Sequence, residues 1–196
     1  MGSERHELDQ IGNRVAGRSS EIVDPLLYGG DSSTDESSQS LIDVLYNEAH
    51  IDDVQRLLDR GADVNERDKL LFTPLEVASM FGKLEIAKTL INHGADVNSR
   101  NSYGGTPFLR AAQYGHVDVA ELLLDNGADI YATQREGLNA LHLAVLQDHF
   151  EVAQFLLQQG ANLHTRCAHG KTPSQYASMY GHQTIAQLLS ECGQGE

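Results

Sequence analysis

The hydrophobic residues of this chain recur at helical spacing in short blocks, and each block ends at the same small turn. Three blocks repeat closely, with apolar residues at Ile86, Ala87, Leu90 and Ile91, at Val119, Ala120, Leu123 and Leu124, and at Val152, Ala153, Leu156 and Leu157. Apolar residues three and four positions apart lie on one face of an α-helix. The pattern therefore predicts a series of amphipathic helices, each of which stops at the Gly-Ala dipeptide that follows it.

A shorter helix is predicted ahead of each of these helices. Residues that cap the start of a helix stand at Ser40, Thr73, Thr106, Asn139 and Thr172. Proline follows at Pro74, Pro107 and Pro173, where its fixed φ suits the first helical position. Glycine ends the short helix at Gly82, Gly115 and Gly181, and Ala49 and Asp148 take its place in two units. Each unit is thus predicted to be a helix, a turn, a second helix and a hairpin loop.

These units recur with a period of 33 residues, seen in the glycines Gly61, Gly94, Gly127, Gly160 and Gly193. A fixed period of this kind is typical of a solenoid, in which each unit buries its apolar face against its neighbours. We predict an all-α solenoid over residues 39–196, with units at 40–67, 68–100, 101–133, 134–166 and 167–196. Residues 1–38 lie outside the period, and their acidic, serine-rich composition predicts a disordered tail. The alternatives are a short docking motif and a segment that folds over the first repeat.

The repeating units resemble the ankyrin repeat family. Residues 139–144, Asn-Ala-Leu-His-Leu-Ala, are similar to the family's Thr-(Pro/Ala)-Leu-His-Leu-Ala motif, and residues 115–124 and 94–98 match its other two landmarks. The resemblance runs from Ser40 to Gly193. It implies stacked helix pairs whose hairpin loops project from one edge, and a protein that binds other proteins without catalysis.

The first and last units depart from the others. Asp53 and Arg56 stand where the internal units are uncharged, and Ser190 replaces a leucine. A solenoid needs a polar outer face on its terminal units, so these substitutions predict an N-terminal and a C-terminal capping repeat. Leu71 replaces the loop glycine found at Gly104, which leaves the shape of its hairpin open.

Composition narrows the class of partner. The net charge is −14, so nucleic acid and anionic membrane surfaces would be repelled, and a protein with a basic or apolar surface fits better. No apolar run approaches the ~18 residues of a membrane span, and the first ten residues do not resemble a secretory signal. Cys167 and Cys192 form neither a disulfide framework nor a metal-site spacing. We expect a monomer in the cytoplasm or the nucleus that neither inserts into membranes nor binds nucleic acid.

No residue pattern indicates catalysis, a cofactor or a metal. The sequence lacks the nucleophile-elbow, phosphate-loop and His-Glu-x-x-His motifs. His50, His116 and His182 fall at one repeat position, which favours a shared structural role. His164, Cys167 and His169 lie in one hairpin, where solvation is favoured over metal binding. We therefore expect a protein that is not an enzyme and that holds no cofactor.

The resemblance also implies which residues face a partner. In ankyrin arrays the end of the first helix faces a concave surface, and these positions hold Met80, Phe81, Gln113, Tyr114, Leu146, Gln147, Met179 and Tyr180. The predicted hairpin tips add Leu70, Phe72, Tyr103, Arg135, Leu138, His169 and Lys171. Exposed apolar stripes mark binding surfaces, and aromatic residues are frequent energetic anchors. We predict partner binding here, with packing of some of these side chains against the neighbouring helix as the alternative.

A second hypothesis that follows from the resemblance is hydroxylation. An oxygen-dependent asparaginyl hydroxylase modifies ankyrin hairpins at an asparagine that follows Val or Ile and has a leucine eight residues upstream. Asn65 and Asn98 fit this pattern. The alternative is that both side chains simply form hydrogen bonds in the turn.

The leading functional prediction is a non-catalytic adaptor, inhibitor or scaffold. One alternative is a host-directed effector of an intracellular bacterium or parasite that uses the same surface, which a translocation assay would test. A more remote alternative is an accessory subunit of an enzyme.

Overall fold

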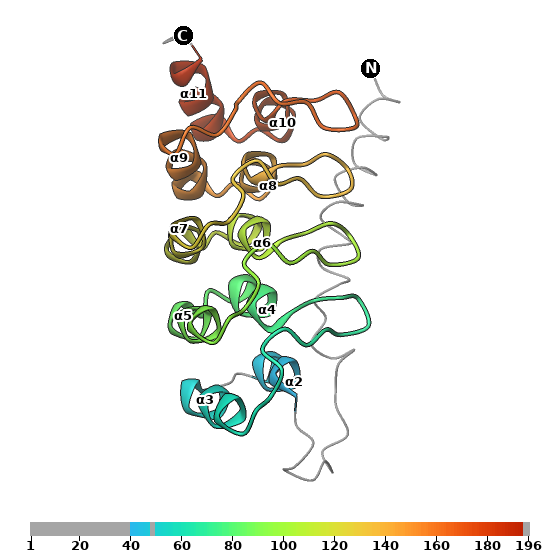
Figure 1. The fold of residues 1–196 in the computed structure, drawn as a ribbon. Coiled ribbons are helices and arrows are strands. Elements are labelled where there is room, and N and C mark those ends of the chain that lie inside the picture. Colours follow the sequence, from blue (N-terminus) through green and yellow to red (C-terminus); the bar gives the residue numbers. More distant parts are fainter. Residues whose placement is uncertain (1–39, 48–49, 194–196) are drawn as a thin grey trace. The chain divides into compact units, whose positions relative to one another are not determined.

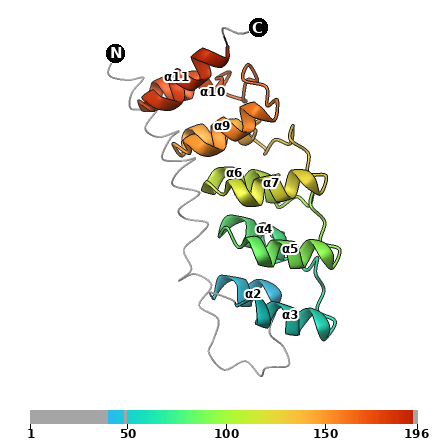
Figure 2. The same cartoon turned by 90° about the vertical axis from the view of Figure 1, so that its left-hand side faces the viewer.

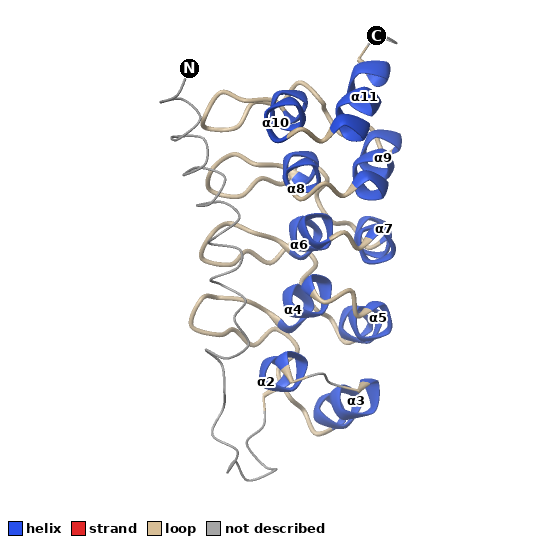
Figure 3. Ribbon diagram, turned by 180° about the vertical axis from the view of Figure 1, so that it is seen from behind, coloured by secondary structure: helices blue, strands red, loops and turns tan. Residues whose placement is uncertain are grey.

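The computed structural model describes residues 40–47 and 50–193, and within this part of the chain it contains ten α-helices and no strand (Figure 3). The helices stack as five pairs, one pair in each predicted repeat (Figure 1). This architecture is the all-α solenoid predicted from the period. The predicted tail, residues 1–38, lies outside the described residues.

The first helices of the five pairs form one row through the stack, and the second helices form another row. The first row contains α2 (Leu41–Tyr46), α4 (Pro74–Met80), α6 (Pro107–Tyr114), α8 (Ala140–Leu146) and α10 (Pro173–Tyr180). The second row contains α3 (Ile51–Asp59), α5 (Leu84–Asn92), α7 (Val117–Asp125), α9 (Phe150–Gln158) and α11 (Gln183–Cys192). Each helix packs on its counterpart in the next pair, as Figures 1 and 2 show. The hairpin loops project from the first row, on the right in Figure 1.

The predicted capping residues begin the helices of the first row. The side chains of Ser40, Thr73, Thr106, Asn139 and Thr172 each accept a hydrogen bond from the backbone N–H three residues later. Each bond satisfies an N–H that has no partner inside the helix, so the chain turns from hairpin to helix at the same place in every repeat.

The core lies between successive pairs. Most periodic positions of the second row are buried, and the last of each block, Ile91, Leu124 and Leu157, is half-buried. The fully inaccessible residues are Ala87, Leu90, Val119, Ala120, Leu123, Val152, Ala153 and Leu156. The first repeat is more open, since Ile51 is 41% exposed and Arg56 forms a surface ion pair with Asp53. This difference is consistent with the polar outer face predicted for the first repeat.

Neighbouring hairpins are joined by single backbone hydrogen bonds. The N–H of Ser102 donates to the carbonyl of Leu70, and the N–H of Arg135 donates to the carbonyl of Tyr103, each at 2.9 Å. The N–H of Ala168 donates to the carbonyl of Glu136 at the same distance. These bonds hold the tips in register, so tip residues of successive repeats form a continuous edge.

The hairpin that contains Leu71 has the same turn as the others. The backbone N–H of Leu71 donates to the carbonyl of Asp68 at 3.0 Å, as Gly104 donates to Asn101 at 2.9 Å. Leu71 adopts a φ of 64°, close to the 76° of Gly104. The open question about this hairpin is therefore answered: its shape is kept, and a leucine occupies the left-handed conformation.

We expect Leu71→Gly to stabilise the array. The left-handed conformation costs a residue with a side chain about 1–2 kcal/mol. The greater freedom of glycine in the unfolded chain offsets about 0.5–1 kcal/mol of this. Leu71 is 44% exposed, so the apolar contacts of its buried part are lost and offset some of this gain. Urea denaturation should show a gain of at most ~0.5 kcal/mol, and Gly104→Ala, the matched control, should lose stability. A less stable Leu71→Gly variant would contradict this explanation.

Candidate protein-binding surface

The residues predicted at the helix ends divide into an accessible and a buried set. Met80 and Gln113 are each only 4% exposed, so for these two the packing alternative is correct. The other six are half-buried or exposed, and we call them the helix-end row: Phe81, Tyr114, Leu146, Gln147, Met179 and Tyr180. The row follows the ends of α4, α6, α8 and α10, so it crosses four of the five repeats.

Aromatic contacts hold several rings of this row in place. Phe81 meets Tyr46 edge to face, with ring centroids 6.0 Å apart. Tyr180 stacks on Tyr176 at 6.3 Å and on His182 at 6.1 Å. Rings that are already fixed lose little conformational entropy when a partner binds, which favours their use as anchors.

The hairpin tips are only partly as predicted. Arg135 and His169 are exposed, and Leu70, Tyr103 and Lys171 are half-buried. The prediction that Phe72 and Leu138 lie on an exposed tip is wrong, because each is 1% exposed. Both residues directly precede a helix-capping residue, at the base of the hairpin where the chain enters the stack. There the ring of Phe72 lies under the guanidinium of Arg110, 5.3 Å from its centroid.

A buried polar cluster connects α4, α6 and the hairpin between them, and we call it the polar centre: Glu76, Asn101, Arg110 and Gln113. Glu76 is fully buried and Arg110 is 7% exposed. Asn101 Nδ2 donates to Glu76 Oε1 at 2.7 Å, and Arg110 Nη1 donates to Gln113 Oε1 at 2.6 Å. Arg110 Nε has no hydrogen-bond partner within the described residues.

Burial dominates the electrostatics of this centre. Desolvation raises the pKa of the Glu76 carboxyl from 4.5 to about 8, and the positive charge of Arg110 offsets only part of the effect. Desolvation also lowers the pKa of the Arg110 guanidinium, which Glu76 opposes. Glu76 is therefore largely protonated at neutral pH. Burial raises the pKa of the Tyr114 hydroxyl, and the positive charge of Arg110 opposes part of this shift.

The sequence prediction did not include this centre. A signal for it exists at the position of Arg110, because Val77, Leu143 and Tyr176 stand there in other repeats. A charged residue in a column of core residues indicates a buried charge that needs polar neighbours. Glu76 stands at the repeat position of the motif histidine, which His142 retains.

The shared role predicted for His50, His116 and His182 is not found for all three, since His50 is exposed and begins α3 of the first repeat. His116 Nε2 lies 3.0 Å from the carbonyl oxygen of Met80, and His149 Nε2 lies 3.0 Å from that of Gln113. The prediction missed His149, because Asp148 rather than glycine precedes it. His182 differs: its Nε2 is buried without a partner in the described part of the chain, and its Nδ1 lies 3.3 Å from Asp148 Oδ1.

The two asparagines predicted as hydroxylation sites also bridge repeats. Asn65 Nδ2 donates to the carbonyl of Gly94 at 3.1 Å, and Asn65 Oδ1 accepts from the N–H of Asp96 at 2.9 Å. Asn98 makes the same two bonds one repeat later, to Gly127 and Asp129, both at 2.9 Å. The hydrogen-bonding alternative therefore holds for both side chains, and it leaves the hydroxylation hypothesis untested.

The described residues contain no group of three His, Cys, Asp or Glu side chains placed to hold a metal ion. Cys167, between the two histidines of its hairpin, is buried with its Sγ 3.4 Å from the hydroxyl of Tyr176. Over the same ranges no helix has the length and apolar character needed to cross a membrane.

Comparison with known proteins agrees with this geometry. The family profile of ankyrin repeats (3 copies) matches residues 15–101, 41–134 and 131–195. A comparison with individual curated proteins found no match. Ankyrin repeats are protein–protein interaction modules and are generally non-catalytic. Because the matched segments cover most of the sequence, the chain belongs to the ankyrin repeat family.

Proposed function

We propose that this protein is a non-catalytic adaptor, inhibitor or scaffold that binds a protein partner across the helix-end row and the exposed hairpin tips. The observation that carries the proposal is the row itself, in which large side chains from four repeats stay accessible although the preceding residues of α4, α6 and α8 are buried. Aromatic residues and methionine are enriched at the centre of protein interfaces, and the row contains Phe81, Tyr114, Met179 and Tyr180.

The charge of the chain supports a basic partner. The net charge is −14, and several cations near the hairpins are already engaged by the fold. Arg67 Nη1 donates to the carbonyl of Arg100, and Arg100 Nη1 donates to the carbonyl of Thr133. A partner with an apolar centre and a basic rim therefore fits this surface. Capture of such a partner should weaken as salt is raised, because screening reduces the attraction between exposed charges. We place the complex in the cytoplasm or the nucleus.

We expect Phe81→Ala together with Tyr114→Ala to abolish partner capture. Loss of one interface anchor typically costs about 2 kcal/mol or more, so two should lower the affinity by ~100-fold or more. Tagged wild-type and variant proteins would be used in parallel affinity captures, with the retained proteins identified by mass spectrometry. Both side chains are only half-buried, so we expect the variant to stay folded.

The matched control for this experiment is Phe150→Ala with Phe155→Ala. These two half-buried phenylalanines belong to α9, in the second row of helices. The control removes a comparable aromatic area without touching the helix-end row. Equal capture by wild type and the Phe81/Tyr114 variant would refute the proposed surface, as would equal loss in the α9 control.

We also propose hydroxylation of Asn65 and Asn98, which rests on the sequence pattern. Each side-chain amide lies in a turn between a second-row helix and the next hairpin, and Asn98 is exposed. Peptide mass spectrometry of protein isolated from its natural host should show the added mass of one oxygen on either residue. Unmodified peptides from oxygen-replete cells would contradict the hypothesis.

A further inference from the structure

Asparagine bridges join the first repeat to the second and the second repeat to the third, and they do not continue to the fourth repeat. Tyr131 stands in the third repeat at the position that Asn65 and Asn98 hold in the first and second repeats. The backbone groups that correspond to the acceptors and donors of the two bridges are the carbonyl of Gly160 and the N–H of Asn162. No hydrogen bond joins either group to another described residue. The side chain of Tyr131 is 71% exposed and makes no bridge.

The backbone around this gap has the same geometry as in the bridged repeats. The N–H of Tyr131 donates to Asp129 Oδ1 at 2.9 Å, as that of Asn98 donates to Asp96 Oδ1 at 2.9 Å. On the other side, the N–H of Gly160 donates to the carbonyl of Leu157 at 3.0 Å. The same bond closes the turn at Gly127. The unpaired carbonyl of Gly160 and N–H of Asn162 therefore have the same arrangement as the backbone groups that bind the carboxamides of Asn65 and Asn98.

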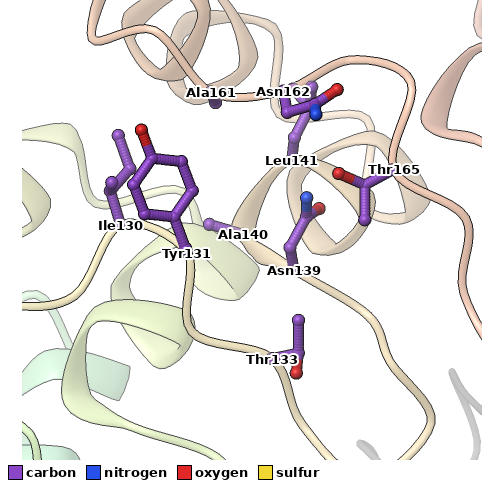
Figure 4. Close-up of a pocket in the computed structure, with 9 residues that line it drawn as sticks. All are labelled: Ile130, Tyr131, Thr133, Asn139, Ala140, Leu141, Ala161, Asn162 and Thr165. Carbon is purple, nitrogen blue, oxygen red and sulfur yellow. The ribbon is translucent and has the colours of Figure 1, made fainter.

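Two pockets share Tyr131 and Asn162 at the gap: a wider one of about 480 Å³, which Gly160 also lines, and a small one of about 110 Å³ between the third and fourth repeats (Figure 4). The walls of the small pocket include Tyr131, Asn139, Ala161, Asn162 and Thr165. In Figure 4 the ring of Tyr131 stands beside Ala161, and the amide of Asn139 points into the space between Tyr131 and Thr165. Asn139 Oδ1 accepts from the N–H of His142 at 3.0 Å, so its amide nitrogen is the group left to line the pocket.

We propose that this gap binds a primary carboxamide of a protein partner, an asparagine or glutamine side chain, which pairs with the carbonyl of Gly160 and the N–H of Asn162 beside the ring of Tyr131. The two bridged repeats show which chemical group completes this pair. A carboxamide carries a donor and an acceptor together, whereas a carboxylate has no donor for Gly160 and an ammonium group has no acceptor for Asn162. The site shares no residue with the helix-end row, so it is a second contact surface of the array.

The proposal is tested by titrating the full, ¹⁵N-labelled chain with propionamide, which carries the end group of a glutamine side chain. We expect a saturable shift of the Asn162 backbone N–H signal with a Kd above 1 mM, since only one small group binds. Propionate should leave this signal in place. An equal response to propionate, or no saturable shift with propionamide, would overturn the proposal and leave water as the occupant.

Variants of Tyr131 make the test specific. Tyr131→Asn supplies the carboxamide from within the chain, so it should abolish the propionamide shift at Asn162 and raise Tm by about 2–4 °C. Tyr131→Ala leaves the backbone pair open and should keep the shift. An unchanged propionamide response in Tyr131→Asn would overturn the proposal.

An engineered gap provides the reverse test. Asn98→Ala removes the second bridge and opens the pair formed by the carbonyl of Gly127 and the N–H of Asp129. This variant should gain a propionamide shift at the Asp129 N–H that the wild type lacks, and absence of that gain would count against the proposal. The Phe81/Tyr114 double variant should bind propionamide normally, so failure of this site and failure of the helix-end row are separately visible.

Discussion

Replacement of Glu76 by glutamine should stabilise the array at pH 8 by about 4 kcal/mol and remove a fall in stability that the wild type shows on the alkaline side. Burial raises the pKa of Glu76 from 4.5 to about 8, so the folded state holds a proton that the unfolded state releases. The contribution of the Glu76 carboxyl to the free energy of unfolding is complete below pH 4.5 and is lost as the pH rises towards 8. The slope is at most about 1.4 kcal/mol per pH unit. Urea denaturation of both proteins between pH 5 and pH 9 measures the difference.

Glutamine suits this site because the last repeat already uses it. Gln175 holds the equivalent position, where its Oε1 accepts from the backbone N–H of Thr172 at 3.0 Å. The control is Glu121→Gln on α7, which removes the same charge from an exposed position. Its stability should follow the wild type at every pH. If the Glu76→Gln curve ran parallel to the wild type instead, the buried carboxyl would not be the cause of the pH dependence.

His142→Ala should lower the free energy of unfolding by about 2–4 kcal/mol. The side chain is fully buried in α8, and its ring lies edge-on to that of Tyr176. Nδ1 lies 2.7 Å from Asn139 Oδ1, and Nε2 lies 3.1 Å from the carbonyl oxygen of Lys171. Alanine would leave a cavity and remove contacts that join the fourth repeat to the fifth. Urea denaturation at pH 7.5 measures the loss.

His142→Leu separates packing from hydrogen bonding, because Leu109 fills the same position in the third repeat. We expect it to lose about half as much stability, and an equal loss in both variants would show that packing contributes little. Burial lowers the pKa of His142 from 6.5, so folding favours the neutral imidazole. The stabilisation that the neutral imidazole of His142 contributes is present above pH 6.5. It falls as the pH drops towards the pKa of His142 in the folded state. The leucine variant should therefore be less sensitive to acid than the wild type.

The fold could be predicted because its determinants are local and repeated. Thr73, Thr106 and Thr172 cap their helices through neighbours three residues away, and the helical spacing of the buried residues is visible in any one repeat. The turn at Leu71 could not be predicted, since its side chain opposes the conformation that the hairpin requires. There, Asp68 Oδ1 accepts from the N–H groups of Leu70 and Phe72, and the N–H of Ser102 in the next hairpin donates to the carbonyl of Leu70. These bonds hold the turn although a leucine occupies it.

The candidate site was less predictable, because accessibility depends on the adjacent repeat. Phe81 and Met80 are neighbours in sequence, yet only Phe81 stays accessible once the stack forms. Phe72 is apolar and lies in a loop, which suggested a tip residue, whereas its contact with Arg110 shows a place in the interior. The polar centre arises from the same cause: its partners come from two repeats, and no single unit contains them.

The last repeat lacks the histidine link that joins the second, third and fourth repeats. His116 and His149 bond through Nε2 to the preceding repeat, whereas His182 makes no bond through Nε2 to the described part of the fourth repeat. In a solenoid, the free energy of local opening depends on the contacts with the nearest neighbour alone. Backbone amides of α10 and α11 should thus exchange hydrogen with solvent faster than those of α6. Met179 and Tyr180 then belong to the part of the binding surface that a partner would protect most strongly from exchange.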